Sequence, residues 1–235
     1  MDWNKFKNKF HRSWHSYVKP FIESEKCDKI YNFLRSRKKE ITPKSILTFR
    51  AFQTNLDNIK CVILLDEPYH TKYQDVHYAD GVPLSCEYVE RMHHNLETFY
   101  NTMEHDFYGL NLHIIKEFDL NFYISQGVLF ISSSLTTEIN NPGAHKDLWV
   151  PFISVLIQDI FIKRKIPIIF GGVNVYNQYS HLIDESFPHF IIKESISDCC
   201  RNGIWTTNNA FSNLNKYLYD NNQDEIMWVN MDVPF

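Results

Sequence analysis

Residues 62–70, with the sequence VILLDEPYH, decide the fold of this chain. Four consecutive apolar residues are typical of a fully buried strand, and two carboxylates and a proline end it abruptly. In open α/β sheets, ligands bind just beyond the carboxyl ends of such strands. The loop therefore offers Asp66, Glu67, Tyr69 and His70 as candidates for a site, although acidic residues and proline are also ordinary turn formers.

Further apolar runs and helical patterns follow along the chain. The strand-like runs are residues 126–131, 166–172 and 189–193. Apolar residues recur at helical spacing over residues 87–105, 145–165 and 208–219. Strands that alternate with helices predict a single α/β domain over residues 1–235, with a central, mostly parallel four-stranded sheet and helices on both faces.

The first 40 residues predict a helical segment that packs on this domain. Phe6, Phe10 and Trp14 lie four residues apart among Lys, Arg and His side chains, which favours a helix with one buried aromatic face. A basic amphipathic helix could instead contact phosphate or an acidic partner. Residues 35–39, RSRKK, form a second basic cluster, which we interpret as a solvated helix end.

Composition narrows the class of protein. The chain has 235 residues and a net charge of -4, so a DNA surface would have to be a local patch. Five cysteines without a CxxC pair match neither a zinc site nor a disulfide scaffold. Residues 1–5 start no signal sequence and no apolar run is long enough for a bilayer. We expect a soluble intracellular protein with no membrane partner, no cofactor and no metal.

Taken in order, several motifs resemble family 1 uracil-DNA glycosylase over nearly the whole chain. Residues 65–70, LDEPYH, stand where the family has Gly-Gln-Asp-Pro-Tyr-His. Residues 81–85, GVPLS, resemble its Gly-Leu-Ala-Phe-Ser, and residues 126–136, QGVLFISSSLT, resemble its Gln-Gly-Val-Leu-Leu-Leu-Asn-x-x-Leu-Thr. His145 and Lys146 resemble the start of the next family helix. The resemblance implies the uracil-DNA glycosylase fold.

The residues that carry the chemistry differ from the family pattern. Glu67 stands where the resemblance implies a water-activating aspartate, and Asp66 replaces the glutamine before it. Leu84 replaces the phenylalanine that stacks on uracil, and Ser132 the asparagine that hydrogen-bonds its edge. Tyr69, which the resemblance places against a thymine methyl, is retained. We therefore expect the base pocket to be formed by Tyr69, Leu84, Ser132 and His70.

The largest departure lies in residues 194–203, which stand where the family has His-Pro-Ser-Pro-Leu-Ser. The resemblance implies a histidine that stabilises the departing base and a leucine that wedges into DNA. Because one gap shifts the alignment, either Glu194 or Ser195 replaces the histidine, and either Asp198 or Cys199 replaces the leucine. Losing one charge-stabilising group typically reduces catalysis about 100- to 1000-fold.

A DNA surface beside this pocket would use polar side chains from several loops. They are Ser133, Ser134, His145, Lys146, Asp198 and Arg201. Acidic side chains in the same cleft would repel phosphate and disfavour duplex binding.

Two functions follow from these residues. The changes favour a uracil-DNA-glycosylase-fold protein that has lost ordinary uracil excision and acts by binding, either to DNA or to a protein of a replication or virion complex. The alternative is an active DNA glycosylase, hydrolysing the N-glycosidic bond, with a pocket rebuilt for uracil or a modified pyrimidine. In that case Glu67 is the general base, Asp66 or Ser132 reads the base edge, and protonated Glu194 donates to the leaving base.

Overall fold

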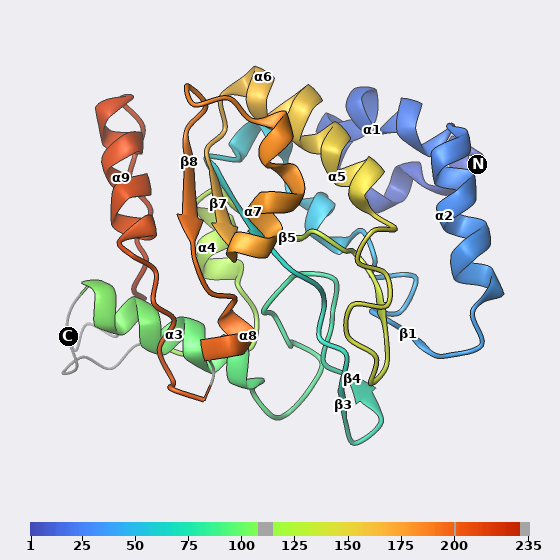
Figure 1. Ribbon diagram of the computed structural model, residues 1–235, viewed down its shortest axis with the longest axis horizontal. Helices are drawn as coiled ribbons and strands as arrows, with labels where there is room; N and C mark the ends of the chain where they lie inside the picture. The colour runs from blue at the N-terminus through green and yellow to red at the C-terminus, as the bar shows by residue number, and fades with distance from the viewer. Residues whose placement is uncertain (108–114, 200, 231–235) are drawn as a thin grey trace.

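A computed structural model describes residues 1–107, 115–199 and 201–230 of the chain. Its centre is a sheet of four parallel strands in the order β5-β2-β7-β8 (Figure 1). The strands are β2 (Cys61–Leu65), β5 (Val128–Ser132), β7 (Ile168–Gly171) and β8 (His189–Ile192). All residues of β2, β5 and β7 are buried, as their continuous apolar runs predict. The predicted sheet is confirmed.

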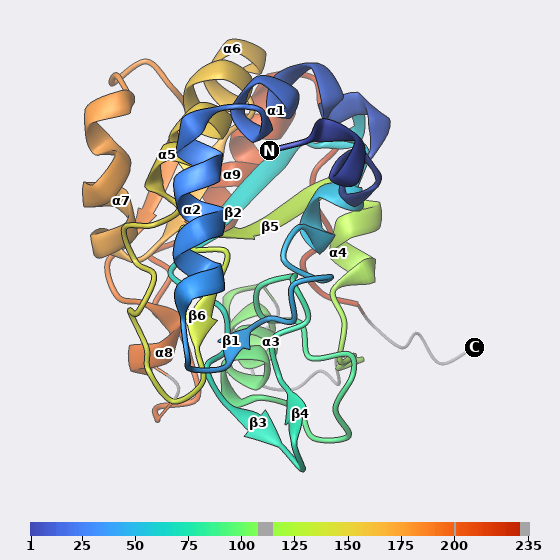
Figure 2. The ribbon, with the colours of Figure 1, turned by 90° about the vertical axis from the view of Figure 1, so that its right-hand side faces the viewer.

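Helices cover both faces of the sheet (Figures 1 and 2). On one face lie α3 (His94–Phe107), α4 (Asn121–Ser125) and α9 (Ala210–Asp220). Phe99 of α3 joins them, because its ring packs against Tyr123 of α4 at 5.3 Å and Phe211 of α9 at 6.2 Å. On the other face lie α7 (Val173–Tyr179) and the helical stretch α5 (Val150–Leu156), η6 (Ile157–Phe161) and α6 (Ile162–Arg164).

The amino-terminal segment packs on the α5 side of the sheet through α1 (His15–Ile22), where Phe21 contacts Phe152 with ring centroids 5.1 Å apart. The long helix predicted from residue 3 is wrong, because the segment starts as three short 3-10 turns, η1 (Trp3–Lys5), η2 (Lys7–Lys9) and η3 (Arg12–Trp14). Burial governs this geometry: Trp14 is fully buried and its indole N–H donates to Thr54 O at 2.8 Å.

The second basic cluster follows α2 (Glu25–Ser36) and is not merely solvated. Arg37 Nε donates to Glu138 Oε1 at 2.6 Å, and Lys39 Nζ lies 3.7 Å from Glu138 Oε2. Glu138 is fully buried in β6 (Thr137–Glu138), which pairs antiparallel with β1 (Ile41–Thr42). The interpretation as a solvated helix end is therefore wrong for Arg37, which neutralises a buried carboxylate.

Two helices begin later than their apolar patterns predict, since α3 starts at residue 94 and α5 at residue 150. The residues before them form turns and loops whose apolar side chains, such as Val89 and Trp149, still reach the core. A short hairpin of β3 (Lys72–Tyr73) and β4 (Val76–His77) follows the loop after β2. Within the described ranges, no helix is long and apolar enough to span a bilayer.

Candidate functional site

The carboxyl ends of the four strands meet at one edge of the sheet, where Leu65 pairs with Ser132 and Gly171 with Ile192. The loops after β2 and β5 are tied together there. Ser134 N donates to Asp66 O at 3.0 Å and Ser133 Oγ donates to the same carbonyl at 2.7 Å. These bonds fix the direction in which Asp66 and Glu67 leave the sheet.

Two adjoining hollows lie at this edge, which we call the inner pocket and the outer trough. Asp66, Glu67, Tyr69, Asn95 and Ser195 are among the residues that line both. The inner pocket extends to further residues, including Leu65, Leu84, Ile131, Ser132, Leu135 and Ile196. The loops after β2, β5 and β8 thus meet at this edge of the sheet.

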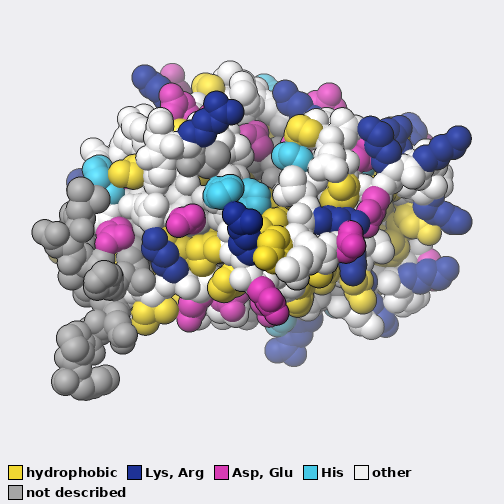
Figure 3. Space-filling view, turned by 90° about the horizontal axis from the view of Figure 1, so that it is seen from below, with side chains coloured by type: hydrophobic (Ala, Val, Ile, Leu, Met, Phe, Trp, Pro, Cys, Tyr) yellow, Lys and Arg dark blue, Asp and Glu magenta, His cyan; other side chains and the backbone are white. Residues whose placement is uncertain are grey.

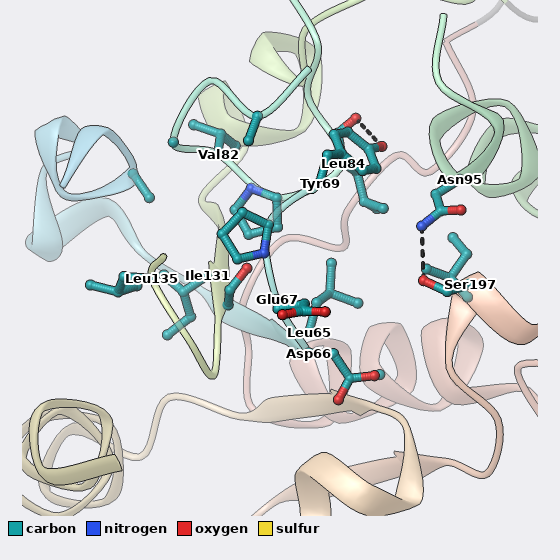
Figure 4. A pocket seen from close by; sticks show the side chains of 18 of the residues that line it. Leu65, Asp66, Glu67, Tyr69, Val82, Leu84, Asn95, Ile131, Leu135 and Ser197 are labelled. Atoms are coloured by element: carbon teal, nitrogen blue, oxygen red, sulfur yellow. Dashed lines mark hydrogen bonds between the residues drawn. The ribbon is translucent and has the colours of Figure 1, made fainter. Parts of the chain in front are cut away.

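Glu67 lies in the middle of the inner pocket (Figure 4). Its carboxylate accepts from the backbone N–H of Gly143, with the nitrogen 2.9 Å from Oε1 and 2.8 Å from Oε2. Gly143 belongs to the loop between β6 and α5, and its φ of +75° is one that glycine adopts readily. A backbone donor in a distant loop therefore sets the orientation of this carboxylate.

Asp66 sits between the inner pocket and the outer trough, with its side chain directed away from that of Glu67 (Figure 4). Burial, aided by the charges of Glu67 and Asp198, raises the pKa of the Asp66 carboxyl to about 6. The charge of Lys146 acts in the opposite direction but does not offset these effects. Asp66 therefore exchanges its proton near neutral pH, as groups in functional clefts often do.

Tyr69 and Leu84 form one wall of the inner pocket (Figure 4). Tyr69 Oη donates to Leu84 O at 2.8 Å, and Leu84 holds a φ of +70°, which is rare for a residue with a side chain. The outer side of Tyr69 stacks on His93, with ring centroids 3.7 Å apart. Burial lowers the pKa of His93 to about 4, so this imidazole is neutral at neutral pH.

Ser132 occupies the end of β5 and faces the inner pocket with 2% of its surface exposed. Its hydroxyl is buried and makes no hydrogen bond within the described part of the chain. A buried polar group without a partner is unfavourable by about 1–3 kcal/mol, so this hydroxyl is suited to a ligand atom. It cannot supply the paired donor and acceptor of an amide.

The structure separates the two candidates for the family's histidine position. Ser195 lines both hollows, and its hydroxyl donates to Asp198 Oδ2 at 2.9 Å. Glu194 is exposed and lines neither, because its carboxylate turns to Cys199, whose thiol donates to it at 3.1 Å. Glu194 as a proton donor to the base is therefore wrong for this arrangement.

The segment after β8 is anchored to α3. Asn95 Nδ2 donates to Ser197 Oγ of α8 (Ile196–Cys199) at 3.0 Å, as Figure 4 shows. Trp205 strengthens the anchor, since its backbone N–H donates to Thr102 Oγ1 at 2.7 Å and its indole N–H to Glu194 O at 2.8 Å. Cys199 is buried and Asp198 exposed, so no apolar side chain projects from the described part of α8 as a wedge.

The candidate DNA contacts divide into exposed and buried residues. Lys146 is exposed at the outer trough, and Arg201 is exposed but lines neither hollow. His70 and Ser133 also line the outer trough, but Ser133 is only 4% exposed. Ser134 and His145 are each 1% exposed. Ser134 Oγ donates to the carbonyls of Thr136 and His145, and the ring of His145 bonds Thr136. Direct DNA contact by these two buried side chains is therefore wrong.

The molecular face seen from below, shown in Figure 3, carries Lys and Arg interspersed with Asp and Glu, with several histidines near its centre. It is not a continuous basic surface of the kind that binds duplex DNA electrostatically. Over the residues that the structure describes, no cluster of three or more His, Cys, Asp or Glu could hold a metal ion.

Sequence reasoning missed three participants: Asn95, Gly143 and His93. Each reaches the site from a segment distant in the chain, and none belongs to a motif of its own. The ring of His93 is half-buried and stacks on Tyr69.

Known proteins similar to this chain share one description. The chain is 29% identical to a uracil-DNA glycosylase of Azobacteroides pseudotrichonymphae, over 94% of this chain and 99% of that protein. It is 29% identical to a uracil-DNA glycosylase of Borrelia turicatae, over 93% and 97%. No family model matches the chain.

Solved structures agree with the fold. The crystal structure of mimivirus uracil-DNA glycosylase superposes with a TM-score of 0.74 at 22% identity, covering 94% of this chain and 88% of that one. The Y81G mutant of the Nitratifractor salsuginis protein gives 0.65 at 13% identity, over 88% and 93%. The chain is therefore similar in sequence to uracil-DNA glycosylases along nearly its whole length, and it has their fold.

Proposed function

We propose that this protein has lost ordinary uracil excision and acts by binding DNA through the edge of the sheet that holds the inner pocket. One observation carries the proposal: among the described residues that line the inner pocket, none is a histidine, lysine or arginine. Excision leaves negative charge on the departing base, and a preorganised donor or cation must stabilise it. The charged side chains that do line it are two carboxylates, Asp66 and Glu67.

The hydroxyl groups of the pocket are weak substitutes for such a donor. Ser195 already donates its proton to Asp198, and Ser132 can offer one hydroxyl hydrogen but no amide. If each missing group reduces the rate about 100- to 1000-fold, two losses together bring uracil excision close to background.

The anchored segment around α8 supports the same proposal. Base extrusion from a duplex uses an inserted apolar side chain to offset the loss of stacking. The exposed Asp198 would instead meet phosphate with like charge. We therefore expect single-stranded DNA to be bound in preference to duplex, with the backbone along Lys146 of the outer trough.

An active glycosylase with a rebuilt pocket is the second candidate, and the position of Glu67 favours it. The carboxylate is oriented by Gly143 and lies inside the pocket, as a general base that activates water must. In this role Glu67 would take a proton from water as the N-glycosidic bond breaks, with uracil or a modified pyrimidine as the leaving base.

A glycosylase assay separates the two. Single- and double-stranded oligonucleotides carrying uracil or modified pyrimidines are incubated with the wild type, with Glu67→Gln, and with Glu185→Gln as a matched control. Glu185 is exposed on the loop before β8, at the opposite edge of the sheet. We expect no abasic sites above the Glu67→Gln background, together with measurable binding of single-stranded DNA.

Two outcomes would overturn this proposal. Abasic sites that disappear only in Glu67→Gln would establish an enzyme of altered specificity. Folded protein that binds neither single- nor double-stranded DNA would point to a protein partner of a replication or virion complex, identified by co-purification from the native host.

A further inference from the structure

The polar groups of the inner pocket form an unusual set for reading a base. They are the carboxylates of Asp66 and Glu67, the hydroxyls of Thr48, Ser132, Ser195 and Ser197, and the amide of Asn95. Ionised carboxylates only accept hydrogen bonds, and they are the only charged side chains in the described lining. The pocket is therefore rich in acceptors.

Internal hydrogen bonds engage two of the donors at the pocket. Ser195 donates to Asp198, and Asn95 Nδ2 donates to Ser197. The hydroxyl of Tyr69, in the pocket wall, donates its hydrogen to Leu84 O and so does not donate to a ligand. The acceptors differ: each oxygen of Glu67 keeps lone-pair capacity beyond its bond from Gly143.

Ser132 is the independent sign that a ligand belongs here. Its hydroxyl is buried, lines the inner pocket and is without a hydrogen-bond partner among the described residues. A hydroxyl can donate to a ring nitrogen or a carbonyl and can equally accept. The hydroxyl of Ser132 can therefore bond to the edge of a base on which a donor and an acceptor lie side by side.

Bases differ in what they present to such a pocket. Uracil offers two carbonyl oxygens around one N–H, so a carboxylate facing an oxygen would repel it. Cytosine replaces one oxygen by an exocyclic amine, and aspartate and glutamate accept from that amine in direct base recognition. Burial above all raises the pKa of Asp66, and no donor among the described residues is hydrogen-bonded to its carboxylate.

We propose that the inner pocket selects a base with an exocyclic amine, of the cytosine type, over uracil, with Asp66 and Glu67 as the acceptors and Ser132 as the contact to the neighbouring ring atom. The inference rests on the proposed function, because it assumes that this pocket receives a base of DNA. The apolar side chains of Leu65, Ile131 and Ile196 complete the lining around the ring.

Competition binding with the full chain tests this selectivity. A labelled thymidine oligonucleotide is displaced by unlabelled ones that carry a single central cytosine, uracil or adenine. We expect the cytosine strand to bind about 10-fold more tightly than the uracil strand. In Asp66→Asn and in Glu67→Gln, the amide can donate to a carbonyl oxygen, so the preference should shrink towards unity.

The matched control is Asp75→Asn, an exposed residue in the turn between β3 and β4 that lines neither hollow. It removes the same charge and should keep the 10-fold ratio. Ser132→Ala gives a second variant, which should weaken binding of the cytosine strand with little change in the thymidine background.

The outcomes are distinguishable from those of the proposed function. Equal or tighter binding of the uracil or adenine strand, or a preference that survives both carboxylate variants, overturns the selectivity while DNA binding stands. If uracil is released and abasic sites are left in the strand, the proposal that excision is lost is overturned, while the measured selectivity is unaffected. Absence of binding to every strand overturns both.

Discussion

The carboxyl group of Asp66 couples the stability of the protein to pH. Its pKa is raised to about 6 in the folded state, chiefly by burial, above the ordinary value of 3.8. The folded state therefore binds more protons than the unfolded state between these values, and stability falls as the pH rises from 4 through 6. Above that range, the folded protein carries the full penalty of a charged Asp66.

Replacing Asp66 by asparagine should remove this penalty. We expect Asp66→Asn to raise the free energy of unfolding by about 1–2 kcal/mol at pH 8, after a discount for partial exposure, and to change it little at pH 4. Urea unfolding at the two pH values measures the difference. Asp75→Asn should show no such dependence, and an equal shift at both pH values would contradict the assignment.

Gly171 illustrates how tightly the end of β7 is packed. A Cβ atom there would overlap Leu65 Cδ2 and approach the ring of Trp205 to 3.2 Å. Gly171→Ala should therefore reduce the free energy of unfolding by about 1–3 kcal/mol, through overpacking. The double variant with Leu65→Ala should lose less than the sum of the two single losses in urea unfolding, because the removed side chain vacates the space.

Among the elements, α8 is held against α3 by the hydrogen bond from Asn95 to Ser197, which borders the pocket. Asn95→Ala should lower the free energy of unfolding by about 1 kcal/mol and speed amide exchange in residues 196–199. Asn213→Ala on the exposed side of α9 serves as control. Unchanged exchange in α8 would show that other contacts, such as those of Trp205, suffice to hold the segment.

Glu138 joins the end of α2 to the loop that carries Gly143. Its carboxylate bonds Arg37 at 2.6 Å and Asn141 at 2.7 Å, and the Arg37 hydrogen bond above all lowers its pKa to about 2. This stabilisation is present above the unfolded pKa of about 4.5 and is lost as the pH falls towards 2.

Glu138→Ala should reduce the free energy of unfolding at pH 7 by about 2 kcal/mol, because Arg37 loses its buried partner but remains partly solvated. It should also loosen Gly143 and thereby Glu67, seen as faster amide exchange at Gly143. The measurements are urea unfolding and hydrogen exchange, with the exposed Glu185→Ala as control. A loss of stability without any change at Gly143 would separate the two effects.

At this scale the sequence predicted strands better than helices. Continuous apolar runs placed all four strands, because a strand buried on both faces leaves little freedom in composition. Residues 3–14 had helical spacing yet form 3-10 turns, since the contacts of Trp14 with distant residues override local propensity. The two-residue strands β1, β3, β4 and β6 are too short to leave a periodic pattern.

For the whole molecule, charge limits how DNA can be held. The net charge is -4, and Lys146 is the one Lys or Arg among the described residues lining the two hollows. Binding of single-stranded DNA should therefore depend weakly on salt, with a log–log slope of about -1 to -2. Lys146→Ala should weaken binding and reduce the slope by about 0.7, whereas Lys5→Ala at the exposed amino terminus should not. Fluorescence anisotropy across a salt series measures both.

The site was predictable where the fold brings strand ends together. The site residues Asp66, Glu67, Tyr69, Ser132 and Ser195 all follow or end strands of the sheet, so a parallel sheet places them at one edge. The partners that orient them could not be predicted. Gly143 and Asn95 are distant in the sequence from Glu67 and Ser197, the residues to which they donate. The positive φ of Leu84 accompanies a hydrogen bond from Tyr69 that only the folded chain forms.

The anchored α8 has a thermodynamic consequence for the proposed role. Because the described part of α8 projects no apolar wedge, the work of opening a base pair would have to come from the DNA itself. Occupancy on a duplex would then follow the breathing of each base step, rising at pyrimidine–purine steps, under negative supercoiling and on warming. Such a protein would bind where the two strands of the duplex have already separated, and its occupancy would report how often each site opens.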